Sequence, residues 1–552
     1  MKTKRLIVLL LAFSLVFTLA ACGGGGEGKV EGNGDFEMTL SIASEPQTID
    51  PALNSAVDGA IMIQHMFEGL MTWEDDGEGN AVITEGQAES YEVSEDGTVY
   101  TFTLRDDAKW SDGEPVTAQD FVYAWQRLVT PETAADYNYM IDMVVNANEI
   151  MAGEVDPSEL GIVAIDKSTL EITLHTPTPY FLEVCAFPAT FPVRQDMIEA
   201  GGDQWTFSEE TYIGNGPYKM EQWEHNSFIR MIPNENYYDY ENLGPSSIKF
   251  MLMDDDNAKL AAYKGGELLF IENPPIDEIP ALLASGELKV ADYIGTYYVC
   301  FNNQLAPFDD ARVREAFSLV IDRNYITEQI SGTGEVPATG YVPAGVYDAE
   351  GPGSDDFRTV GGDYYSVDPA EYEANCERAR ELLAEAGYPN GEGFPIVDYL
   401  YNTADNHRAI GEALQNMWQN ELGVTVTLTN QDWGVFLQTR KDGDYSIARN
   451  GWIADYNDPI SFLDMWVTGG GNNDAQYSNP EYDALIAKVK KATTQEERFQ
   501  YMHEAEDILL GQDKFSAPIY FYTQPYMLSD KVKGMYYTPL GYFFFSYASL
   551  AE

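Results

Sequence analysis

An arginine and an aspartate six residues apart are the two side chains in this sequence best suited to hold a small charged ligand. Arg449 and Asp455 lie in the segment 448–459, together with Trp452 and Tyr456. The planar guanidinium of arginine binds a carboxylate through two parallel hydrogen bonds, and a carboxylate binds an ammonium group. Aromatic faces bury the rest of a ligand with little demand on its side chains. A zwitterion such as a short peptide needs this set of groups.

The spacing of the two charges predicts a bend between them. Fully extended, six residues span roughly 20 Å, whereas the ends of a tripeptide are about 10 Å apart. The chain can bend most easily at Gly451, because glycine tolerates strained backbone conformations. A purely structural interpretation stays open at this point. In it, a strand over 445–449 ends in a glycine turn, and the aromatic side chains are buried in an ordinary core.

The first residues indicate export from the cell. Three basic residues precede an apolar run over 6–21, which is typical of a secretory signal and too short for a stable membrane span. The run ends in Leu19-Ala20-Ala21-Cys22, which resembles the lipobox of bacterial lipoproteins, where the cysteine becomes the lipidated first residue. We interpret residues 1–22 as a lipoprotein signal peptide with its lipobox, and the Gly-rich segment 23–35 as a tether. The alternative is a soluble secreted protein with an incidental cysteine.

The charge of the chain excludes some classes of partner. The full sequence has 32 Lys and Arg against 90 Asp and Glu, and residues 1–21 contain three of the positive charges and none of the negative ones. The mature chain therefore carries a net charge of −61. A general nucleic-acid-binding protein needs a basic surface, and docking by charge on an anionic membrane needs one too. We expect neither activity.

Signatures of catalysis or of metal binding are missing from the sequence. None of the five histidines is paired at the spacing of a metalloprotease, and no serine lies in a GxSxG segment. The cysteines are Cys22, Cys185, Cys300 and Cys376, which are too few and too scattered for a zinc site or a disulfide framework. With Cys22 lipidated, at most one disulfide can form, and buried free thiols are the default expectation. We predict no catalytic residue, no metal and no cofactor; a secreted hydrolase is the disfavoured alternative.

Strands and helices alternate along the chain, which predicts the α/β class. The mature length of about 530 residues predicts two to four domains. Expected strands lie at 38–43, 100–105, 169–174, 228–232, 248–253 and 424–428. Expected helices lie at 57–70, from Thr117 onward, and at 312–330 (capped near Asp309), 369–386, 406–422, 480 onward and 494–510.

Several motifs in one order carry a resemblance to a known family. They are Glu45-Pro46-Gln47-Thr48-Ile49-Asp50-Pro51, Phe67-Glu68-Gly69-Leu70, the block from Tyr100 to Leu128, Asn302-Asn303-Gln304, 309–314, 382–388 and Leu400-Tyr401-Asn402-Thr403. The chain resembles the extracellular solute-binding proteins that serve oligopeptide and dipeptide ABC importers, from about Ser44 to Ser546. It is most similar to the oligopeptide-binding branch of that family.

The resemblance implies a two-lobed, type II periplasmic-binding-protein-like fold with an additional domain on the first lobe. The expected segments are 36–67, 195–295 and 523–552 for the first lobe, 68–194 for the additional domain, and 296–522 for the second lobe. The implied function is capture of short peptides by a monomer anchored through Cys22 at the outer face of the cytoplasmic membrane, and delivery to ABC permease subunits. The same fold binding a nickel chelate, haem or a glycan is the alternative.

The resemblance also implies a set of binding residues. Asp455 matches the acidic residue that binds the α-ammonium group of the ligand, and Arg449 and His407 match residues that receive its carboxylate. The other matches are Trp433 and Trp452 as pocket walls with Gly451 beside them, Arg440 as a further pocket arginine, and Tyr137 and Asn273 as contacts from elsewhere in the chain.

Two departures from the family pattern are visible. Enteric members have cysteines where this chain has Gly295 and Ile453, and residues 331–357 contain no lysine to serve the shortest peptides. The second departure argues against dipeptides more than against longer peptides.

Overall fold

The computed structural model describes residues 36–77 and 79–551. The predicted signal segment, the lipobox with Cys22 and the tether lie outside this part of the chain. None of the helices within it is long and apolar enough to cross a membrane. The described cysteines Cys185, Cys300 and Cys376 are all buried free thiols, which confirms that expectation.

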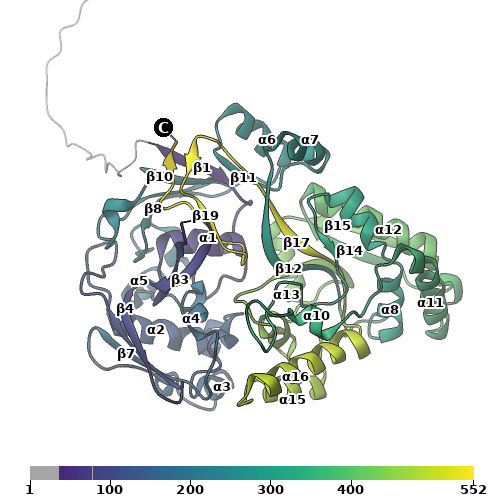
Figure 1. Cartoon of the computed structure of the whole chain (residues 1–552), viewed down its shortest axis with the longest axis horizontal. Coiled ribbons are helices and arrows are strands. Elements are labelled where there is room, and N and C mark those ends of the chain that lie inside the picture. Colours follow the sequence, from purple (N-terminus) through teal and green to yellow (C-terminus); the bar gives the residue numbers. More distant parts are fainter. Residues whose placement is uncertain (1–35, 78, 552) are drawn as a thin grey trace, which may run out of the picture.

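A large mixed sheet passes through the whole molecule and contains eleven strands among the described residues. Figure 1 shows its two halves side by side, with β12 and β17 running between them. The strand order is β15 (Val426–Gln431), β14 (Val397–Asn402), β16 (Ile447–Ile453), β12 (Lys289–Phe301), β17 (Ser516–Leu528), β11 (Phe270–Glu272), β1 (Glu37–Ser41), β10 (Ser247–Met251), β9 (Phe228–Pro233) and β8 (Tyr218–Glu224), with β13 (Val336–Pro337) beside β17.

The two long antiparallel strands β12 and β17 belong to both halves of the sheet. The C-terminal part of β12 pairs with β16, whereas the C-terminal part of β17 pairs with β11. Both strands are rich in β-branched and aromatic residues, which favour a pleated and largely buried strand. Their mutual register shifts between the Asp292 and Thr296 positions of β12 and again between Tyr297 and Tyr298. Irregular pairing of this kind lets a strand twist and bend locally.

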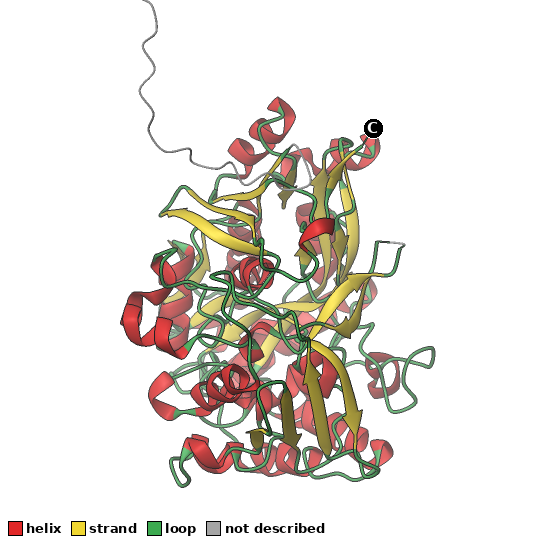
Figure 2. Cartoon of the chain, turned by 90° about the vertical axis from the view of Figure 1, so that its left-hand side faces the viewer, coloured by secondary structure: helices red, strands yellow, loops and turns green. Residues whose placement is uncertain are grey.

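A smaller four-stranded antiparallel sheet lies apart from the large one. Its strand order is β4 (Ala88–Val93), β5 (Val99–Leu104), β7 (Thr169–Thr173) and β6 (Ile162–Ala164). Figure 2 faces this side of the molecule and shows the small sheet below the strands of the large one. Helix α2 (Ala118–Val129) packs on it, and the Thr117 amide donates to Asp120 Oδ2 (2.8 Å) at the helix start. The hairpin β2 (Met71–Asp75) and β3 (Ala81–Glu85) precedes this sheet.

Helices cover the second half of the large sheet. Phe317 and Trp418 stack 5.3 Å apart in a separate hydrophobic cluster beneath them. The helices of this half include α8 (Ala311–Leu319), α9 (Arg323–Ile326), α11 (Tyr372–Glu385), α12 (Asp405–Leu422), α13 (Trp433–Lys441), α15 (Pro480–Val489) and α16 (Gln495–Glu506). The expected helices at 369–386, 406–422 and 480 onward are confirmed.

Two sequence-based helix boundaries were wrong. The helix expected over 312–330 is broken, because Asp322 Oδ1 accepts the Tyr325 amide (3.0 Å) and so caps a new short helix. The cap expected near Asp309 is its neighbour Asp310, whose Oδ1 accepts the Arg312 amide (2.9 Å). Helix α1 (Val57–Met66) ends at Met66, because Phe67 is already extended.

The expected bend at Gly451 was also wrong. Strand β16 continues through this residue, and an unbroken register pairs it with β12 from Gly295 opposite Ile453 to Phe301 opposite Ile447. These hydrogen bonds hold the backbone extended, so no turn forms. The same register places Gly295 and Ile453, which the family resemblance had singled out, directly opposite each other.

Candidate functional site

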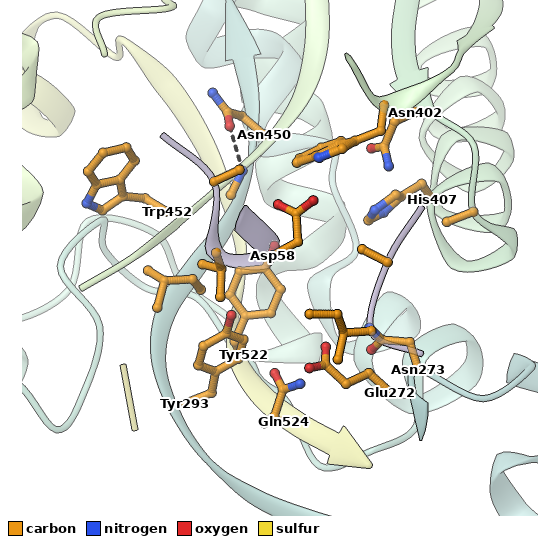
Figure 3. Close-up of a pocket in the computed structure, with 18 of the residues that line it drawn as sticks. Asp58, Glu272, Asn273, Tyr293, Asn402, His407, Asn450, Trp452, Tyr522 and Gln524 are labelled. Atoms are coloured by element: carbon orange, nitrogen blue, oxygen red, sulfur yellow. Dashed lines mark hydrogen bonds between the residues drawn. The ribbon is translucent and has the colours of Figure 1, made fainter. Parts of the chain in front are cut away.

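A cavity of about 400 Å³ lies where the two halves of the sheet meet. All nine predicted binding residues line it, together with parts of α1, β11, β12 and β17. Figure 3 shows several of these side chains around one space, with Trp452 on the left, His407 and Asn402 on the right, and Tyr293, Gln524 and Glu272 below. Residues far apart in the sequence therefore meet at one place.

Asp455 is a buried carboxylate at the end of β16, with 6% of its surface exposed. Its Oδ1 accepts from the Tyr137 hydroxyl (2.9 Å) and its Oδ2 from Ser461 Oγ (3.2 Å). Among the described residues, no lysine, arginine or histidine forms an ion pair with it. Burial raises the pKa of Asp455 well above its ordinary value, because the charged form loses water without gaining a cation.

Arg449, which lies in strand β16, is a buried cation. Its side chain is buried, and its Nε donates to Asn402 Oδ1 (2.7 Å). The guanidinium carbon lies 5.5 Å from the Trp433 ring centre and 5.4 Å from that of Phe436. No carboxylate in the described part of the chain forms an ion pair with Arg449. Its remaining donors are therefore available to a ligand carboxylate.

His407 and Arg440 differ in whether they are available to bind a ligand carboxylate. Burial, together with the nearby Arg449 guanidinium, lowers the pKa of His407 well below its ordinary value, so its imidazole is neutral. A neutral ring can hydrogen-bond to a carboxylate without adding charge. Arg440, in contrast, already forms an ion pair with Asp474 (3.2 Å) and contacts Asn450. The positive charge of Arg440 is therefore already balanced by Asp474.

Aromatic side chains and a glycine form the walls. The Trp452 indole donates to the Ser461 carbonyl (2.7 Å), which fixes the ring, and Trp433 begins helix α13. Gly451 makes room for Tyr522, since a Cβ there would lie 2.2 Å from the Tyr522 hydroxyl oxygen. Glycine is needed at this position because the Tyr522 side chain packs against it, not because the chain turns.

Tyr137 and Asn273 come from the other half of the molecule. The Tyr137 hydroxyl reaches Asp455 across the cavity, as described above. Asn273 follows β11 and adopts a left-handed backbone (φ of 50°), which asparagine tolerates better than most residues. Both residues face the same space as the charged groups of β16.

Of the lining carboxylates, the sequence reasoning found only Asp455, and two of those that it missed matter below. Asp58 lies in the first turn of α1 and Glu272 ends β11, 214 residues later in the chain. Neither has a local motif, and acidic residues are too common in this sequence to stand out. Only the tertiary fold brings them together.

Comparisons with sequence families and with solved structures both find solute-binding proteins. Residues 83–474 match the sequence model described as bacterial extracellular solute-binding proteins, family 5 middle. The oligopeptide-binding protein OppA of Bacillus subtilis is 33% identical over 545 residues, which cover 97% of each chain. The Haemophilus influenzae OppA complex with the peptide RPPGFSPFR has a TM-score of 0.86 at 32% identity, over 94% of this chain and 99% of that one.

One further comparison concerns the conformation. The murein tripeptide-binding protein MppA in its unliganded open form has a TM-score of only 0.60, at 33% identity and over 94% of this chain and 98% of that one. Sequence identity and coverage are similar in the two structural comparisons. The difference in TM-score therefore indicates that the present conformation is similar to the peptide complex rather than to the open form.

Proposed function

Since the chain belongs to family 5 of the bacterial extracellular solute-binding proteins, we propose that it captures short peptides between two lobes and delivers them to the permease of an ABC importer. It is a solute-binding protein and not an enzyme. The proposal includes anchoring through a lipid on Cys22 at the outer face of the cytoplasmic membrane. A peptide fits the site better than a nickel chelate, haem or a glycan, because those ligands do not carry one ammonium and one carboxylate at opposite ends.

One observation carries the proposal. Asp455 and Arg449 are both buried in one cavity, and neither has an oppositely charged partner among the described residues. An unpaired buried charge costs several kcal/mol. The two termini of a peptide supply both missing partners at once, Asp455 receiving the ammonium and Arg449 the carboxylate.

The extended strand sets the length of ligand that can reach both residues. Because β16 stays extended from Arg449 to Ile453, the backbone runs roughly 13 Å along the strand before it reaches the segment that carries Asp455. The long arginine side chain shortens the distance to be bridged. We therefore favour peptides longer than a dipeptide, bound in an extended form, with His407 assisting Arg449 when the carboxylate position varies with length.

Closure of the two lobes would enclose the peptide. We place the hinge at the irregular pairing of β12 and β17, near Tyr293–Gly295 and Tyr522, which supports lobe boundaries at 295 and 522 and the segments 36–67, 68–194, 195–295, 296–522 and 523–552. Contacts between segment 68–194 and segment 296–522 favour the closed form. Lys441 pairs with Asp136 (2.5 Å), and the rings of Tyr180 and Tyr456 stack with centres 4.2 Å apart.

A thermodynamic cycle tests the assignment of Asp455. Tetra-alanine and its N-acetylated form are titrated by calorimetry into the wild-type protein and into Asp455→Asn, which keeps the shape of the side chain but removes its charge. Truncating one partner of a buried charge pair costs about 2–5 kcal/mol, or roughly 30- to several-thousand-fold in affinity. The free peptide should lose this affinity, whereas the acetylated peptide should bind wild type poorly and respond little to the substitution.

A coupling energy near zero would mean that Asp455 does not bind the amino terminus. The same cycle with Arg449→Gln and a C-terminally amidated peptide should give a smaller coupling, because His407 shares the carboxylate. Mass spectrometry of small molecules released from the purified protein by denaturation identifies the cargo directly. Haem, a metal chelate or a glycan in that fraction, with no peptide, would contradict the proposal.

A further inference from the structure

The cavity has more negative charge than its own cations can balance. Eight aspartates and glutamates line it, against four lysines and arginines. Three of the four cations already have carboxylate partners: Lys259 with Asp256, Arg440 with Asp474, and Lys441 with Asp136. The fourth cation, Arg449, is the proposed partner of the peptide carboxylate. A bound peptide with neutral side chains would therefore leave the excess negative charge in place.

Asp58 is one of the carboxylates left over. It is 9% exposed, and its Oδ2 makes no hydrogen bond in the described part of the chain, although it faces the cavity (Figure 3). Its only side-chain donor among the described residues is the neutral indole of the nearby Trp433, so no cation balances its charge. Burial raises the pKa of Asp58 to about 6. A buried polar atom without a partner is rare in folded proteins and indicates that a missing group completes it.

Glu272 is the second carboxylate without a cation. It borders the same cavity, and its only side-chain hydrogen-bonding influence comes from Gln524, while the nearest lysine, Lys259, is already paired with Asp256. The negative charge of Asp58 adds to burial in raising the pKa of Glu272 to about 8. The two carboxylates thus repel each other across one space, where a single cation would stabilise both.

We propose that Asp58 and Glu272 form a subsite for the cationic side chain of a lysine or arginine near the carboxyl end of the bound peptide. The position follows from Trp433, which lies beside Asp58 and also 5.5 Å from the guanidinium of Arg449. A metal ion is a poorer occupant, because no three His, Cys, Asp or Glu of the described residues are grouped to hold one. This subsite rests on the proposed peptide-binding function and adds a substrate class to it.

The test compares peptides that differ only in the charge of one side chain. Ala-Ala-Ala-Lys is compared with its norleucine analogue, which has a similar length but no charge, and with Lys-Ala-Ala-Ala, which places the cation at the other end. Wild type should bind the C-terminal lysine peptide about 10-fold or more tightly than the norleucine peptide. The preference should fall several-fold in Asp58→Asn and in Glu272→Gln, and should vanish in the double variant.

A matched control is available at Asp254, an exposed carboxylate that also borders the cavity. Asp254→Asn removes the same charge, and the preference for the lysine peptide should persist in it. If the double variant keeps the full preference, or if wild type shows none, the subsite does not exist. Binding of the norleucine peptide distinguishes the two possible failures. If this peptide binds but the lysine preference is absent, only the subsite is wrong. If no peptide binds at all, the proposed function is wrong.

Discussion

Lowering the pH should close the unliganded protein. Asp58 and Glu272 face the cavity, and separation of the lobes would expose both to water and return their pKa values to the ordinary range. In the closed form burial raises the pKa of Glu272 from 4.5 to about 8 and that of Asp58 from 3.8 to about 6. The closed form therefore binds protons more tightly than the open form, so closure is opposed above these pKa values and becomes easier as the pH falls through them.

The magnitude follows from these two pKa values. One pKa unit corresponds to about 1.4 kcal/mol. Between about pH 8 and pH 6, the linkage relation gives a rise in the decadic logarithm of the closed-to-open ratio. Protonation of Glu272 contributes about 1.7 to this rise, and protonation of Asp58 contributes about 0.3. The ratio of closed to open protein should thus rise at most roughly 100-fold, or about 3 kcal/mol. The Lys259–Asp256 ion pair (2.7 Å) lies beside Glu272, and the Lys259 charge lowers the pKa of Glu272 against the effect of burial.

Small-angle X-ray scattering of the ligand-free protein measures the change as a fall in the radius of gyration. The Asp58→Asn/Glu272→Gln variant is the control, because it lacks both titrating groups. Its response to pH should be much weaker. Asp455 and Glu183 also have raised pKa values and leave a residual response of the same sign. Equal pH responses in the double variant and in wild type would refute the reasoning.

The remaining predictions concern single positions. Gly451→Ala should destabilise the protein by about 1–3 kcal/mol through overpacking against the Tyr522 hydroxyl; a urea titration measures this, and a second substitution, Tyr522→Phe, should restore stability. Asp455→Asn should raise the melting temperature of the ligand-free protein at pH 8, because it removes a buried carboxylate of raised pKa, while weakening peptide binding. Arg358→Ala should cost about 3–5 kcal/mol in urea unfolding, since it leaves Glu506, which is fully buried and paired with Arg358 (2.6 Å), without a cation; an unchanged midpoint would contradict this. Cys22→Ser should release the protein from membranes into the medium, and retention at the wild-type level would exclude lipid anchoring at this residue.

Local patterns predicted the elements whose signals are local. Helix α15 follows from the Asn479-Pro480 pair, because Asn479 accepts the Glu481 amide and proline fits the first helical turn. The break after α8 was missed, because the apolar periodicity continues across it and only the capping by Asp322 decides the boundary. Gly451 was misjudged for a related reason. Its conformation is set by pairing with β12, which lies about 150 residues earlier in the sequence.

Part of the candidate site could be predicted from the sequence, and part could not. Nine residues predicted from the sequence line the cavity: residue type and spacing singled out the group around Arg449 and Asp455, and the family resemblance supplied the others. Asp58 and Glu272 lie in no recognisable motif. They suggest a binding site only because no cation forms an ion pair with them among the described residues. Such a shortage becomes visible only when every neighbouring side chain is placed.

The pairing of Gly295 with Ile453 has a consequence for how the protein can be produced. Two strands meet there without a covalent link, and the isoleucine side chain occupies space that any residue larger than glycine at position 295 would need. Because the three described cysteines are buried thiols as well, the described part of the chain holds no disulfide that would have to form by oxidation. We therefore expect the protein to reach its native state when it is produced in a reducing cytoplasm.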